Sequence, residues 1–67
     1  MNERVKIFGQ KVRQIRISKG ISQERLAELA GIDRSYMGNI ERGEKNVTLK
    51  KAYEICDALN VDIKTIV

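Results

Sequence analysis

Apolar residues recur near the start of the chain at the three- and four-residue steps of an amphipathic helix. Between residues 3 and 19 these positions are Val5, Phe8, Val12 and Ile15, with Ile7 and Ile17 beside them. Gly20 follows directly, and glycine commonly ends a helix because it adopts a left-handed backbone conformation without strain. The pattern predicts a first helix over residues 3–19.

The stretch from Ser22 to Gly43 has the pattern of two short helices joined by a glycine. The Ser22 hydroxyl can cap a helix whose apolar positions are Leu26, Ala27, Leu29 and Ala30. Gly31 marks the corner between the helices, and the Asp33 carboxylate can cap the second one. We therefore predict two helices that meet at a steep angle, with Gly43 closing the second.

The second of these helices divides into two opposed faces when its residues are placed at about 100° per residue. Met37 and Ile40 form the apolar face. The polar face carries Ser35, Gly38, Asn39 and Arg42, with Arg34 at its edge. Arginine, hydroxyl and amide groups supply the donors and acceptors that base edges and phosphates pair with. The second helix is therefore interpreted as a DNA-reading helix.

The last third of the chain continues the helical pattern. Residues 44–47 are polar and predict an exposed loop beside the reading helix. Thr48 can cap a further helix, in which the apolar positions are Leu49, Ala52, Ile55, Cys56 and Leu59. Asn60 can end that helix, and Asp62 can cap a last short turn that carries Ile63, Ile66 and Val67.

Size and charge narrow the class of protein. A chain of 67 residues has room for one hydrophobic core, so residues 1–67 are predicted to form a single all-α domain of five helices. Residues 1–20 hold six basic side chains against one acid, Glu3, within a net charge of +4. The basic residues are Arg4, Lys6, Lys11, Arg13, Arg16 and Lys19. Such a field favours an anionic partner.

Several kinds of chemistry are excluded by the residues present. The chain has no histidine and one cysteine, Cys56, so it offers neither a zinc-ligand set nor an internal disulfide. Cys56 is interpreted as a small buried apolar residue. No carboxylate pair occupies a plausible cleft, so we expect no enzyme, cofactor, metal or small-molecule ligand. No apolar run suits a membrane span or a signal peptide, which predicts a cytoplasmic protein.

Residues 23–40 resemble the helix-turn-helix of the Cro/phage-repressor (XRE-like) family. The matching positions are Gln23, Ala27, Gly31, Met37 and Ile40. The resemblance extends over nearly the whole chain: FGQKVRQIRISKGIS is similar to the family's first helix and turn, and VTLKKAYEICDALNVDIKTIV to its fourth and fifth. DRSYMGNIERGEKNVTL is similar to the controller proteins of restriction-modification systems. The resemblance implies a compact lambda-repressor-like fold in a bacterial or phage-encoded regulator.

Three residues are candidate base readers in such a motif. Arg34 lies in the first turn of the reading helix, which enters the major groove, and arginine can donate two bonds to guanine O6 and N7. Ser35 and Asn39 share its outward face, where each can contact a base or a phosphate. Gly38 either allows a close approach to DNA or is simply tolerated.

The resemblance also implies a set of residues that contact the DNA backbone: Gln23, Tyr36, Arg42, Lys45 and Asn46. Gln23 would bind phosphate and brace the reading helix, whereas Tyr36 could instead pack its ring against the preceding helix. Arg16 and Glu41 match positions that form a largely buried ion pair in the family. Asp33 is interpreted as a cap and not a reader, because a carboxylate in the groove would repel phosphate.

The sequence thus predicts a homodimeric transcription regulator that binds a double-stranded, pseudo-palindromic DNA operator, with half-sites roughly 34 Å apart. Ile63, Ile66 and Val67, with part of the fourth helix, are predicted to form the dimer contact. Two alternatives stay open: a DNA-binding antitoxin, which would also neutralise a partner protein, and a protein-interaction module on the same fold.

Overall fold

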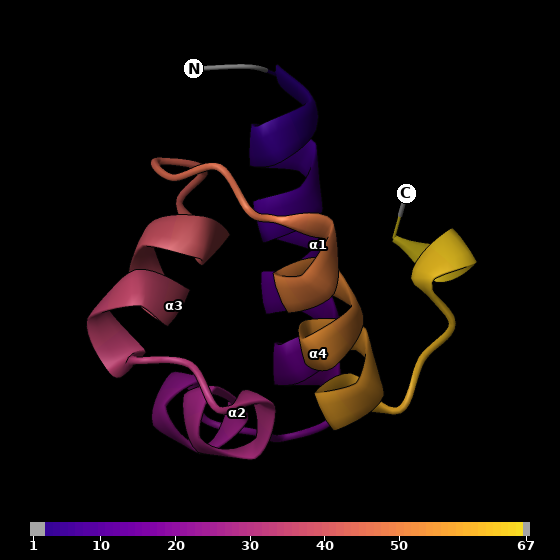
Figure 1. The fold of residues 1–67 in the computed structure, drawn as a ribbon. Helices are drawn as coiled ribbons and strands as arrows, with labels where there is room; N and C mark the ends of the chain where they lie inside the picture. The colour runs from indigo at the N-terminus through magenta and orange to yellow at the C-terminus, as the bar shows by residue number, and fades with distance from the viewer. Residues whose placement is uncertain (1–2, 67) are drawn as a thin grey trace.

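The computed structural model describes residues 3–66, which form an all-α fold with no strand in that range. Its elements are α1 (Glu3–Ser18), α2 (Gln23–Ala30), α3 (Arg34–Glu41), α4 (Leu49–Leu59) and η1 (Ile63–Thr65) (Figure 1). The all-α prediction is confirmed, with one correction to the number of helices. The fifth element is a single 3₁₀ turn, because its hydrogen bonds run from Thr65 to Asp62 and from Ile66 to Ile63.

The predicted helix starts are confirmed by their capping bonds. The Ser22 hydroxyl accepts from the backbone N–H of Arg25 at 3.0 Å, and the Asp33 carboxylate accepts from that of Ser35 at 2.9 Å. The Thr48 hydroxyl caps α4 in the same way, by accepting from the backbone N–H of Lys51 at 3.2 Å. Asn60 ends α4 with a positive φ of 58°. Each cap satisfies backbone groups that a helix end otherwise leaves without partners.

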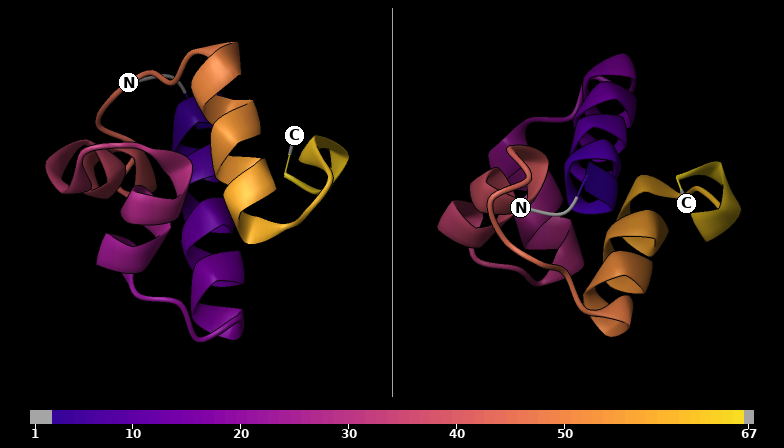
Figure 2. Two further views of the ribbon diagram at one scale, coloured as in Figure 1. Left: turned by 60° about the horizontal axis from the view of Figure 1, so that its bottom comes forward. Right: turned by 90° about the horizontal axis from the view of Figure 1, so that it is seen from above.

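The helices enclose one core, which is aliphatic except for Phe8, Met37 and Cys56. α1 and α4 lie side by side through the middle of the molecule, whereas α3 and η1 lie on opposite sides of them (Figures 1 and 2). The core consists of Phe8, Val12, Leu26, Ala27, Ala30, Ile32, Met37, Ile40, Ala52, Ile55, Cys56, Leu59 and Ile66. Met37 and Ile40 are 0% and 1% exposed, so α3 is anchored by its apolar face and presents its polar face outward.

Gly9 marks the closest approach between α1 and α3. A Cβ atom at this position would overlap the carbonyl oxygen of Ile40 and stand 2.9 Å from that of Glu41. The two helix backbones therefore touch with no side chain between them. The sequence pattern did not single out Gly9, although a glycine inside a well-formed amphipathic helix was a visible signal.

The predicted role of Ile66 in a dimer contact does not agree with its position in the structure. Ile66 is 2% exposed and belongs to the core of its own chain, where it borders Phe8 on α1. Its side chain is therefore not available for a dimer contact, because η1 folds back and buries it. Ile63 is partly buried at the edge of the core, and Val67 lies outside the described residues.

Candidate DNA-binding surface

A shallow hollow on the outward face of α3 collects the predicted base readers. It is lined by Gln23, Arg34, Ser35, Gly38, Asn39 and Arg42. The three candidate base readers therefore lie together, beside Gln23 at the start of α2. Since the opposite face of α3 is buried, these side chains are held on a rigid helix.

Arg34 is largely accessible to solvent. It is the first residue of α3, and its side chain is 70% exposed. Its nearest carboxylate oxygen is Oε2 of Glu24, 3.7 Å from Nη1, and an exposed pair at this distance holds a guanidinium only weakly. Arg34 can therefore turn toward a base edge at little cost.

Glu41 joins three segments of the chain beneath the reading face. Arg16 donates to it twice, from Nε to Oε2 at 2.8 Å and from Nη2 to Oε1 at 3.1 Å. Gln23 donates from Nε2 to Oε1 at 3.2 Å. Arg16 also donates to the carbonyl of Ile21 at 2.9 Å. Because the Glu41 side chain is only 2% exposed, this network fixes the end of α3 against α1 and the start of α2.

The end of α3 carries a second, exposed network. Arg42 donates from Nη2 to Oδ1 of Asn39 at 2.6 Å and from Nε to Oε1 of Glu44 at 3.0 Å. A Cβ at Gly38 would stand 3.1 Å from Nη1 of Arg42. The guanidinium therefore lies back across α3, a geometry that the sequence analysis did not foresee.

Tyr36 fastens the loop that follows α3. Its hydroxyl donates to the backbone carbonyl of Asn46 at 3.0 Å, and its ring is half-buried against the core. The ring is thus directed toward the loop, and the hydroxyl oxygen can still accept a bond. Lys45 and Asn46 are exposed in this loop.

The one cysteine of the chain, Cys56, lies in the core. Cys56 is 1% exposed, and burial, aided by Asp57 and Asp62, raises the pKa of its thiol above the ordinary value. Within residues 3–66 no group of three metal-ligating side chains comes together. In the same range no helix has the length and apolar character needed to cross a bilayer.

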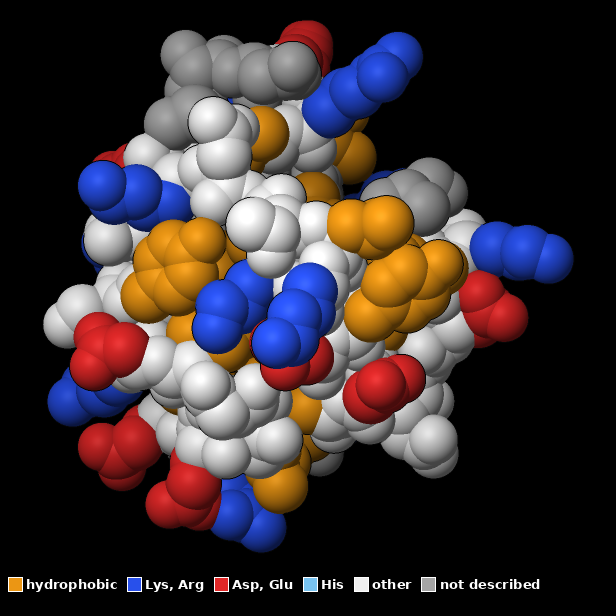
Figure 3. Space-filling model, viewed as in Figure 1, with side chains coloured by type: hydrophobic (Ala, Val, Ile, Leu, Met, Phe, Trp, Pro, Cys, Tyr) orange, Lys and Arg blue, Asp and Glu red, His pale blue; other side chains and the backbone are white. Residues whose placement is uncertain are grey.

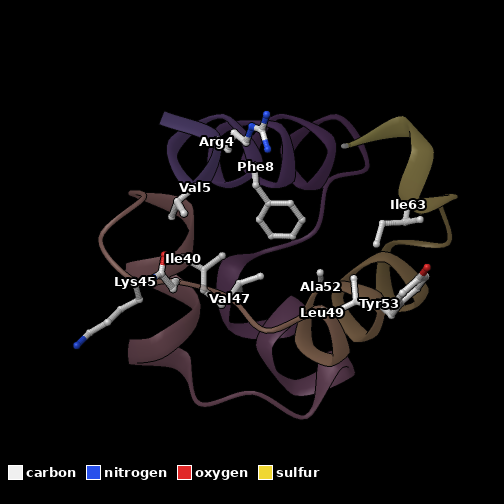
Figure 4. A pocket seen from close by; sticks show the side chains of 11 residues that line it. Arg4, Val5, Phe8, Ile40, Lys45, Val47, Leu49, Ala52, Tyr53 and Ile63 are labelled. Carbon is white, nitrogen blue, oxygen red and sulfur yellow. The ribbon is translucent and has the colours of Figure 1, made fainter. Parts of the chain in front are cut away.

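An apolar hollow opens on another part of the molecule. Side chains from α1, the loop after α3, α4 and η1 surround it, and the Phe8 ring points into it (Figure 4). Leu49 and Tyr53 on its α4 side are 69% and 48% exposed. Apolar side chains gather there between α4 and the C-terminal segment (Figure 3). The sequence pattern placed Leu49 on the buried face of its helix. That prediction is wrong, because its side chain is largely exposed to solvent.

The fold and the arrangement of α2 and α3 agree with comparisons to known proteins. The model of the helix-turn-helix family matches residues 12–66 of the chain. The chain belongs to this family. Control protein C.BamHI of Bacillus amyloliquefaciens is 51% identical over 59 residues, which make up 87% of this chain and 73% of that protein.

Two solved structures extend the comparison to controller proteins. The restriction-modification controller protein C.AhdI from Aeromonas hydrophila is 45% identical, with a TM-score of 0.91 and coverage of 97% of both chains. The tetramer of controller protein C.Esp1396I in complex with its natural 35 base-pair operator is 30% identical, with a TM-score of 0.91. That match covers 98% of this chain and 87% of the other. The resemblance to controller proteins in this helix-turn-helix family is confirmed.

Proposed function

We propose that this chain is a sequence-specific transcription regulator that controls a restriction-modification operon by binding a pseudo-palindromic operator as a homodimer. The observation that carries the proposal is the outward face of α3. Arg34, Ser35 and Asn39 lie together on it, while the opposite face is buried. The relatives support the proposal, because several are control proteins and one was solved with its operator.

In this proposal α3 enters the major groove with its N-terminal turn leading, as in other helix-turn-helix proteins. Arg34, Ser35 and Asn39 contact base edges. The phosphate backbone on either side is contacted by Gln23, Tyr36, Arg42, Lys45 and Asn46. Tyr36 would do so by turning its hydroxyl proton from the Asn46 carbonyl to a phosphate oxygen, because a phosphate oxygen only accepts. Gln23 is well suited to a phosphate contact, because it begins α2 and its side chain is braced by Glu41. The chain acts by binding alone, without catalysis, in the cytoplasm.

The dimer contact is proposed to form at the apolar hollow beside α4. A single reading helix contacts only a few base pairs, so operator recognition needs two copies related by a two-fold axis. Leu49, Tyr53 and Ile63 border the hollow and supply an apolar surface that a second copy of the chain can cover. Covering these side chains removes exposed apolar area from water, which favours association.

Leu49→Lys is expected to weaken the dimer. A buried charge at the centre of an apolar contact should raise the dissociation constant by about 30-fold, which corresponds to about 2 kcal/mol. Sedimentation equilibrium over a range of protein concentrations measures this directly. Leu29→Lys is the matched control, because Leu29 is also an exposed leucine, 46% accessible, but lies away from the hollow. Equal dimerisation of the two variants would place the contact elsewhere.

Selection of bound sequences from random DNA duplexes tests the proposed function as a whole. The unmodified chain is expected to enrich duplexes that contain two inverted copies of one short sequence. Their centres should lie about 10 base pairs apart, one turn of the double helix. Enrichment of single copies would contradict the homodimer, and the absence of any enrichment would contradict sequence-specific binding.

A further inference from the structure

The guanidinium of Arg42 is held on the reading face by two protein acceptors. Arg42 follows the last residue of α3, and its side chain turns back along the helix. Nη2 donates to Oδ1 of Asn39 at 2.6 Å, and Nε donates to Oε1 of Glu44 at 3.0 Å. Arg42 thus links Asn39, one of the proposed base-reading residues, to Glu44 in the loop after α3.

Gly38 provides the space that this arrangement needs. A Cβ there would stand 3.1 Å from Nη1 and 3.7 Å from Nη2 of Arg42. The first of these distances is tighter than an ordinary van der Waals contact, so any side chain at this position would push the guanidinium outward. The glycine in the reading helix therefore has a structural role on its outward face, despite the weaker helix propensity of glycine.

The bond from Arg42 fixes which way the Asn39 amide faces. A guanidinium has only donors, so the group that faces it must be the amide oxygen and not the amide nitrogen. The two N–H donors of Nδ2 then point away from Arg42. An unrestrained asparagine, by contrast, pairs with adenine by using its oxygen and its nitrogen together.

We propose that Arg42 is a positioning residue that makes Asn39 select guanine over adenine. With Oδ1 already engaged, Asn39 presents donors, and guanine offers two acceptors, N7 and O6, in the major groove. Adenine offers one acceptor and one donor, and its donor would have to share the amide oxygen with the cationic guanidinium of Arg42. The proposal rests on the proposed function, because it assumes that α3 lies in the major groove.

The charge balance at Arg42 supports positioning as its main role. Glu44 places a carboxylate against the same guanidinium, and the two side chains are 57% and 56% exposed. An arginine paired in this way attracts phosphate less than an unpaired one, since the neighbouring negative charge offsets its field. The Arg42 guanidinium therefore still holds the Asn39 amide in place, whereas its contribution to sequence-independent DNA affinity is reduced.

The test is a comparison of base preference among variants of the full chain. Asn39→Ala identifies the base position that Asn39 contacts, because the preference there is lost. At that position the unmodified chain should prefer guanine. Arg42→Met should reverse the preference toward adenine, changing the guanine-to-adenine affinity ratio by about tenfold. Gly38→Ala should change the ratio in the same direction, because its Cβ displaces the guanidinium. Preferences at the remaining positions should not change.

Lys45→Ala is the control for a residue that contacts only phosphate. It should lower affinity on all sequences and leave every base preference intact. The inference is overturned if Arg42→Met behaves like Lys45→Ala, or if Asn39→Ala changes no base preference. In both cases the unmodified chain still selects sequences, so the proposed function stands. If the unmodified chain shows no base preference at all, the proposed function fails first and the inference fails with it.

Discussion

Gly9→Ala is expected to lower the free energy of unfolding by about 3 kcal/mol or more, although alanine normally strengthens a helix relative to glycine by about 1 kcal/mol. The added Cβ would overlap the backbone oxygen of Ile40 and stand 2.9 Å from that of Glu41. Neither oxygen can rotate away as a side chain could, so α1 and α3 would have to separate. For a chain of 67 residues this is a large share of the total free energy of unfolding.

Urea or thermal denaturation followed by circular dichroism measures this loss, which corresponds to a decrease in Tm of about 4–8 °C for each kcal/mol. Gly38→Ala is the matched control, because Gly38, like Gly9, lies within a helix. The nearest atoms to its new Cβ belong to the ends of the Arg42 and Gln23 side chains, and both can shift. Its stability should remain near that of the unmodified chain or rise by up to about 1 kcal/mol. Equal stability of the two variants would show that α1 and α3 are not in close contact.

Glu41→Gln is expected to cost about 3–5 kcal/mol, because it removes the negative charge from a pair whose side chains are 12% and 2% exposed. The neutral amide leaves the Arg16 charge buried without compensation. The amide also replaces one carboxylate oxygen with an NH₂ group. That group faces the N–H donors of Arg16 and Gln23, which then share one acceptor oxygen in place of two. Chemical denaturation gives the change in the free energy of unfolding, and DNA titration of the folded fraction gives the effect on affinity.

A second variant separates the role of the pair in stability from its role in orientation. Arg16→Met combined with Glu41→Leu replaces both charges with apolar groups of similar size, which often restores stability. We expect it to recover at least half of the loss. Its DNA affinity should stay reduced, because Gln23 loses the acceptor that now braces it. Recovery of full affinity together with stability would mean that the network does not position Gln23.

The helices and their caps could be predicted because each depends on residues close together in the chain. Ser22, Asp33 and Thr48 act on backbone groups two or three positions away, and Asn60 needs only its own tolerance of a positive φ. The division of α3 into two faces follows from helical periodicity alone. Local rules therefore sufficed for the elements and for the outward position of Arg34, Ser35 and Asn39.

The errors concern contacts between distant segments. Leu49 has the spacing of a core residue, but it lies at the first position of α4, where no neighbouring element covers it. Ile66 looked available for a partner, yet η1 returns it to the core of its own chain. Gly9 gains its importance only from the approach of α3. The orientation of Asn39 likewise depends on how Arg42 turns, which helical periodicity does not specify.

Titration of the selected operator with Arg34→Ala and Lys45→Ala tests most directly whether α3 reads bases. Arg34→Ala is predicted to abolish the preference at one base position in each half-site and to cost about 1–3 kcal/mol of binding free energy. Lys45→Ala is predicted to lower affinity on all sequences and to reduce the slope of log affinity against log salt by about one. If both variants keep every base preference of the unmodified chain, the base-reading role of Arg34 at the start of α3 is contradicted.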